Sequence, residues 1–133
     1  MTIARQGKEL VVEVVNDIGV LQEVAKTVSD KGINILAVHG EANGNKAVFR
    51  LVTDDNLRAG DALKARKYAV HEADAVLVEI PNKPGMLRQI VGKLAASGID
   101  IRHIGGSALV AADRCLIVLD CSNNGHAVVV LNE

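Results

Sequence analysis

Residues 12–21 read VEVVNDIGVL, and residues 78–87 read VEIPNKPGML. The second stretch keeps the asparagine, glycine and leucine of the first, after the same kind of valine-rich run. Placing residue 12 over residue 78 aligns 12–54 with 78–120 without a gap, and 12 of those 43 positions are identical. Coincident glycines and asparagines at one spacing indicate an internal duplication, so two copies of one structural unit are expected.

Each copy predicts the same order of elements. A short aliphatic run, 10–15 in the first copy and 75–80 in the second, predicts a buried strand that ends at an Asn-x-x-Gly turn. Apolar residues at i, i+1, i+4, i+5 and i+8 then predict an amphipathic helix. The first copy continues with predicted strands at 33–40 and 47–53, a helix at 56–67 and a strand at 68–72. This β-α-β-β-α-β order is the ferredoxin-like motif.

The second copy is shorter at its end. It predicts hairpin strands at 105–110 and 114–120 and a helix at 125–132, with no residues left for a last strand. The predicted fold is therefore α+β, with two ferredoxin-like βαββαβ repeats forming a continuous antiparallel sheet with helices on one face, the second repeat lacking its last strand. The expected domains are 1–72 and 73–133.

A missing last strand has a consequence for assembly. The run 75–80 would present an open row of backbone donors and acceptors, an edge that natural proteins rarely leave bare. We therefore expect at least a homodimer, with this edge covered by a second chain or by a rearranged segment such as residues 1–8.

The composition of the chain excludes several classes of function. With 15 basic and 16 acidic side chains and only two aromatic residues, the chain lacks the basic face and stacking platform of a nucleic-acid-binding protein. No apolar stretch is long enough to span a membrane and no secretory signal opens the chain, so a cytoplasmic protein is expected. The two cysteines and four histidines show no metal-ligand, disulfide or catalytic spacing. Arg50, between Phe49 and Leu51, is expected on the solvent face of its strand. We therefore expect no enzyme activity, no metal and no cofactor.

The repeated turn resembles that of a known family. Asn-x-x-Gly-x-Leu after a first strand, followed by Gly-Ile-Asn-Ile or Gly-Ile-Asp-Ile, resembles the ACT domain over residues 9–72 and 74–132. The resemblance implies ferredoxin-like modules that bind amino acids or related metabolites and regulate enzymes or transcription factors. It is nearest to the serine-binding domains of phosphoglycerate dehydrogenases, although the histidine of their turn is replaced by Val14 and Ile80. Two such modules in one chain resemble stand-alone tandem ACT proteins.

The turns also predict a ligand site on physical grounds. A helix start presents unpaired N–H groups and the positive end of the helix dipole, and glycine lets a carboxylate approach them. An asparagine side chain can accept from an ammonium group and donate to a carboxylate. The alternative is an asparagine that caps the helix beside a glycine needed only by the turn. The candidate ligand-binding residues are Asn16, Asp17, Ile18, Gly19, Val20, Leu21, Asn82, Lys83, Pro84, Gly85, Met86 and Leu87.

Two further candidates follow from the resemblance. In the ACT family, modules join side by side through their second strands, and the residue after Gly-Ile contacts the ligand of the neighbouring module. If the two copies join in this way, Asn16 faces Asp100 and Asn82 faces Asn34. The aspartate would make the first site unlike the second, because it can hold an ammonium group by a charge-assisted hydrogen bond. The alternative is that Asn34 and Asp100 are solvated residues that bridge a turn.

The expected function is that of a regulatory protein that senses an amino acid or related metabolite and acts on a partner protein. The alternative is a regulatory small subunit of an amino-acid biosynthetic enzyme, such as acetolactate synthase, in which contact with the metabolic enzyme is the main activity.

Overall fold

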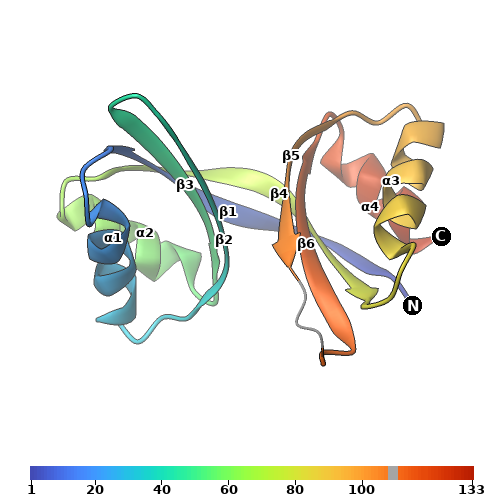
Figure 1. Ribbon diagram of the computed structural model, residues 1–133, viewed down its shortest axis with the longest axis horizontal. Helices are drawn as coiled ribbons and strands as arrows, with labels where there is room; N and C mark the ends of the chain where they lie inside the picture. Colours follow the sequence, from blue (N-terminus) through green and yellow to red (C-terminus); the bar gives the residue numbers. More distant parts are fainter. Residues whose placement is uncertain (108–110) are drawn as a thin grey trace. The chain divides into compact units, whose positions relative to one another are not determined.

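The computed structural model describes residues 1–107 and 111–133. In this part of the chain, four helices and six strands follow one another in the order β-α-β-β-α-β-α-β-β-α (Figure 1). Their bounds are β1 Ile3–Val15, α1 Val20–Ser29, β2 Ile35–Asn43, β3 Lys46–Thr53, α2 Asn56–Ala65, β4 Ala69–Pro81, α3 Met86–Ala96, β5 Ile101–Ser107, β6 Arg114–Cys121 and α4 Asn124–Asn132. The strands pair in the order β2-β3-β1-β4-β6-β5, which confirms the predicted α+β class. The end of the expected strand 105–110 lies outside the described residues.

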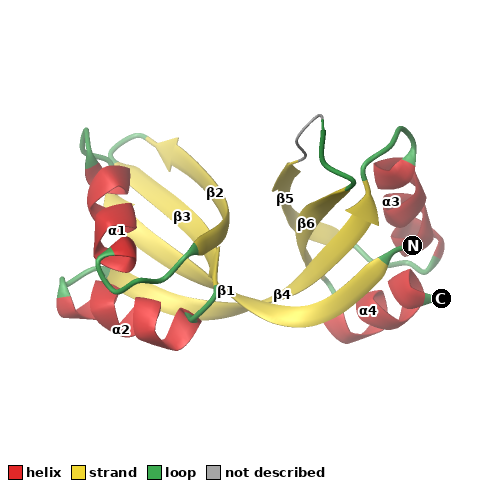
Figure 2. Cartoon of the chain, turned by 90° about the horizontal axis from the view of Figure 1, so that it is seen from below, coloured by secondary structure: helices red, strands yellow, loops and turns green. Residues whose placement is uncertain are grey.

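The first unit consists of Lys8–Ala73. Its strand β1 pairs antiparallel with β3, with Leu10 opposite Leu51, and β3 pairs antiparallel with β2. Helices α1 and α2 cover one face of these strands (Figure 2). Because side chains alternate along a strand, every second residue of β1 enters the core beneath the helices. That core contains Leu10, Val12, Val24, Val28, Ile33, Leu51, Ala59 and Leu63.

The second unit consists of Asp74–Glu133 together with Met1–Gly7. Within it β4 pairs antiparallel with β6, with Val76 opposite Leu119, and β6 pairs with β5. The core beneath α3 and α4 repeats that of the first unit, and it contains Val76, Val78, Ile80, Ile90, Leu94, Leu119 and Leu131. Ala4, from the other end of the chain, is buried in the same core.

Residues 1–7 thus occupy the place of a last strand in the second unit. Strand β1 begins at Ile3, well before the predicted start at residue 10, and its first part belongs to the second unit. The predicted strands 68–72 and 75–80 form one strand, β4, whose first residues belong to the first unit. The open edge is therefore covered by the rearranged N-terminal segment. The compact units differ from the expected 1–72 and 73–133 chiefly in this segment.

The residue offset that relates the first copy to the second changes at the hairpin between the second and third strands of each copy. Val12 pairs with Phe49, and the gap-free alignment places these two residues over Val78 and Cys115. In the structure Val78 pairs instead with Ile117, two positions further along the chain. The hairpin of the second copy is therefore longer by two positions. The gap-free alignment was wrong beyond β2, and Asp54 corresponds to Ser122 rather than to Asp120.

Candidate functional site

Each Asn-x-x-Gly turn, residues 16–19 and 82–85, ends in a glycine with a left-handed backbone. Gly19 has φ 87° and Gly85 has φ 90°, and each is the N-cap residue of the helix that follows. A non-glycine side chain rarely adopts this conformation. A β-carbon added at either glycine would meet nothing within 4 Å. The space over both turns is therefore open, and the glycines are required by the backbone conformation.

The helices after these turns begin differently from the other two. The side chain of Asp55 caps α2 by accepting from the Arg58 N–H, and Asn123 caps α4 by accepting from the His126 N–H. No side chain of the described residues caps α1 or α3. The first turns of α1 and α3 thus keep backbone N–H groups that no capping side chain satisfies, the arrangement that binds anions at helix starts.

The asparagines of the turns do not cap the helices, so the capping part of that alternative is wrong. The Asn16 side-chain amide donates to the carbonyl oxygen of Gly44 at 3.2 Å, and that of Asn82 donates to Ala112 at 2.9 Å. Each asparagine ties the turn to the neighbouring hairpin of its own unit. One N–H of each amide is therefore engaged within the protein, and Asn82 has a further partner. In the first turn this favours the Asn16 amide oxygen as the group that would meet a ligand.

A hollow lies beside each turn. In the first unit it has a volume of about 570 Å³ and is lined by Asp17, Ile18, Gly19, Val20 and Glu23, with Lys67 and Tyr68 opposite. In the second unit it has a volume of about 360 Å³ and is lined by Lys83, Met86, Gln89 and Lys93, together with Pro81 and residues 1–2 and 131–133 from the two ends of the chain. Both volumes lie in the range of small-molecule sites. The charges differ, because Lys83 and Gln89 stand where the first unit has Asp17 and Glu23.

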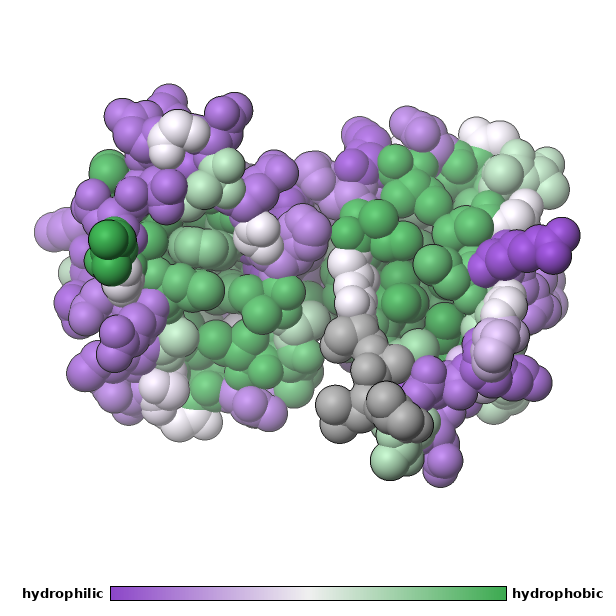
Figure 3. Space-filling view, viewed as in Figure 1, coloured by the Kyte–Doolittle hydropathy of each residue, from purple (hydrophilic) through white to green (hydrophobic). Residues whose placement is uncertain are grey.

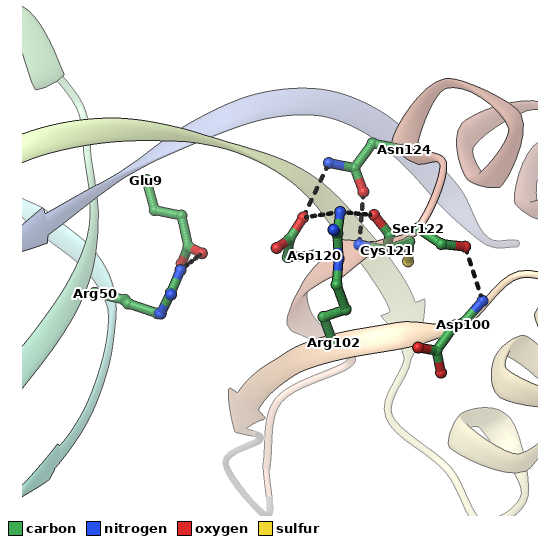
Figure 4. Close-up of polar contacts among 8 residues, drawn as sticks. All are labelled: Glu9, Arg50, Asp100, Arg102, Asp120, Cys121, Ser122 and Asn124. Carbon is green, nitrogen blue, oxygen red and sulfur yellow. Dashed lines mark hydrogen bonds and ion pairs between the residues drawn. The ribbon is translucent and has the colours of Figure 1, made fainter.

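Asn34 and Asp100 are exposed and directly precede the second strand of each unit, β2 and β5. The Asn34 N–H donates to the Asp54 carboxylate at 3.1 Å, and the Asp100 N–H donates to the Ser122 hydroxyl at 3.0 Å (Figure 4). Helix α1 separates Asn34 from Asn16 by its full length, about 15 Å. Strands β2 and β5 are the two ends of the strand order and are not paired with each other. Among the described strands, the pairing of second strands considered above is therefore not formed.

Apolar side chains are exposed along these edge strands. Leu36 and Val38 of β2 are 48% and 57% exposed, and Ile104 of β5 is 42% exposed. Leu21 and Leu87, in the first turns of α1 and α3, are also exposed. Figure 3 shows apolar side chains gathered between α1 and β2 in the first unit and between α3 and β5 in the second. This is the surface against which another strand and helix can pack.

Sequence reasoning missed a polar network in the second unit. Arg102 donates to the Cys121 carbonyl oxygen at 2.6 Å and lies 3.6 Å from the Asp120 carboxylate (Figure 4). The Asn124 side chain accepts from the Cys121 N–H at 2.7 Å, as Asn56 does from the Thr53 N–H in the first unit. Burial, followed by the nearby Asp120 carboxylate, raises the pKa of the Cys121 thiol. An alignment that allowed for the longer second hairpin would have revealed the Asn56–Asn124 correspondence.

Within residues 1–107 and 111–133, no three His, Cys, Asp or Glu side chains are grouped as metal ligands. None of the helices in this part of the chain is both long and apolar enough to cross a membrane.

The family profile described as ACT domain pair matches residues 1–133. The chain belongs to this family. The ACT resemblance of the repeated turn is thus confirmed over the whole length, and ACT domains are regulatory rather than catalytic modules. No protein of curated function matches the ACT domain pair at a significant level.

Solved structures agree with this assignment. A protein from Bacteroides thetaiotaomicron is 29% identical to this ACT domain pair, with a TM-score of 0.89 over 97% of this chain and 88% of that one. The ligand-free regulatory subunit of aspartate kinase from Thermus thermophilus has a TM-score of 0.67 at 14% identity, over 98% of this chain and 94% of that one. The corresponding subunit from Thermus flavus has a TM-score of 0.62 at 14% identity, over 98% and 94%. The two subunits share the fold.

Proposed function

We propose that this ACT domain pair is a regulatory protein that binds an amino acid, or a related metabolite, at its two Asn-x-x-Gly turns. The observation that carries the proposal is the contrast among the four described helices. Side chains cap α2 and α4, whereas α1 and α3 begin uncapped behind a left-handed glycine in open space. A ligand carboxylate would accept from the uncapped amides, and the asparagine amide oxygen would accept from the ligand's ammonium group.

The proposed sites are unequal. Asp17 lines the hollow of the first unit, and Lys83 lines the equivalent hollow of the second. A ligand with a cationic side chain would be favoured beside Asp17 and one with an anionic side chain beside Lys83. The remaining side chains of the turns, Ile18 and Pro84, are exposed, so they do not restrict the charge of the ligand at either site.

A second copy of the chain would complete each site. Asn34 and Asp100 are exposed beside the two edge strands, β2 and β5, and neither lies at the turn of its own unit. Joining copies through these edges, with Leu36 and Val38 buried, would bring the polar groups of one copy to the turn of the other. The oligomer would then respond to the ligand by mass action. We propose that this response is transmitted to a metabolic enzyme; two similar folds are regulatory subunits of aspartate kinase.

Calorimetric titration with each of the twenty amino acids tests the proposal. A saturable response to one or a few amino acids is expected, with light scattering that changes on addition of the same compound. No response to any of the twenty would favour the alternative, in which the protein acts through contact with a partner enzyme alone.

A further inference from the structure

The second unit holds residues 1–7 almost entirely by their main chain. The Asn132 side chain accepts from the Ala4 N–H and donates to the Ala4 carbonyl oxygen, both at 2.8 Å. Arg114 donates to the carbonyl oxygen of Met1 at 2.7 Å. Strand β4 is the hydrogen-bonded neighbour of β1 in the sheet. None of these contacts depends on which side chains the segment carries, except that a proline would lack the N–H.

The side chains of residues 1–7 contribute little burial. Ala4 is 5% exposed and is the single side chain of this segment within the core, whereas Ile3 is 40% and Met1 83% exposed. In the first unit Val70 of β4, and Tyr68 directly before that strand, place larger side chains against the core. When Asn56 is placed over Asn124, the position that corresponds to Asn132 is Lys64. The first unit thus holds the first residues of β4 by apolar packing. The second unit holds residues 1–7 in the equivalent place by the Asn132 side-chain amide, which bonds to their backbone.

We propose that the edge of β4 in the second unit, residues 74–81, is an acceptor site for an extended strand, and that residues 1–7 of a second copy can take the place of the chain's own segment there. The second copy is the occupant because its residues 1–7 offer the same backbone groups to Asn132 and the same small side chain to the core. When two copies exchange identical segments, each segment makes in its partner the same contacts that it made in its own chain, so no new contact is required. Exchange requires the segment to leave its place, which its shallow burial allows.

Native-state hydrogen exchange on the full chain gives the first test. Along the single strand β1, the amides of residues 3–6, which belong to the second unit, are expected to exchange at least tenfold faster than those of residues 10–12. Equal protection of the two halves would overturn the proposal, because the segment would then leave only when the whole strand unfolds.

A peptide with the sequence of residues 1–8 gives the second test. The variant Ala4→Arg, which places a long cation where only a methyl group fits, is expected to bind the labelled peptide at least tenfold more tightly than the unaltered chain does, by fluorescence anisotropy. The same peptide carrying Ala4→Arg is the matched control and should not bind. Equal, weak binding of both peptides would show that the acceptor site does not exist. Should Ala4→Arg fail to fold, the exchange measurement on the unaltered chain decides alone.

Discussion

Arg50 on β3 lies 3.2 Å from the carboxylate of Glu9 on β1, and the Glu9 side chain is only 6% exposed (Figure 4). The two residues are in the first unit and reach each other across adjacent strands. Arg50 has further partners, and its own side chain is 18% exposed. Two charges so far removed from water depend on each other, because either one left alone loses its hydration without compensation.

Replacing Arg50 by alanine is therefore expected to lower the free energy of unfolding by about 3 kcal/mol, the lower end for a broken buried pair, since Arg50 is partly exposed. Urea denaturation measures this change in the free energy of unfolding. The double variant Glu9→Leu with Arg50→Leu should recover most of the loss. Strictly additive losses would show that the pair is not coupled.

The glycines of the turns give a prediction about binding. Gly85→Val should remove ligand-induced thermal stabilisation at the second site, because valine disfavours φ 90° and its side chain enters the open space over the helix start. Gly98→Val is the matched control, since Gly98 has φ 69° but lies at the other end of α3. Both variants should lose about 1–2 kcal/mol of stability. Ligand stabilisation that survives in the double variant Gly19→Val with Gly85→Val would place the site elsewhere.

Asn132 provides a test of how the second unit is closed. Asn132→Ala removes both hydrogen bonds to Ala4 and should cost about 1–3 kcal/mol. Lys64→Ala changes the equivalent exposed position of α2 and is expected to cost under about 0.5 kcal/mol. Similar losses in the two variants would mean that the amide does not hold the segment.

The Cys121 thiol gives a prediction about pH. Its pKa is raised in the folded protein, so its contribution to stability is fully present below the unfolded pKa of about 8.5 and is lost as the pH rises through the folded pKa. The free energy of unfolding, measured from pH 7 to 10, should therefore fall more steeply for the unaltered chain than for Cys121→Ala. Parallel curves would contradict the shift. Disulfide reagents at pH 8 should modify Cys115, which is only half-buried, before Cys121.

The sequence by itself determined the repeat, the order of elements and the positions of the two turns. These features are local, since a left-handed glycine, a valine-rich strand and a helical stripe each depend on neighbouring residues alone. The helix starts at Gly19 and Gly85 could therefore be predicted. The alternation of β3 also predicted a solvent-facing Arg50, and this was wrong because Glu9, from a distant part of the chain, covers it.

Only the tertiary structure decided where the strands go. Residues 1–7 carry a single buried methyl group, so no hydrophobic pattern marks them as a strand, and it is Asn132 and the edge of β4 that order them. The extra length of the second hairpin was equally hidden, because both offsets place aliphatic residues opposite one another until backbone pairing fixes the register. Every residue type except proline offers the same backbone hydrogen-bonding groups, so the sequence does not show which strands pair through them or in which register. The tertiary structure decides both.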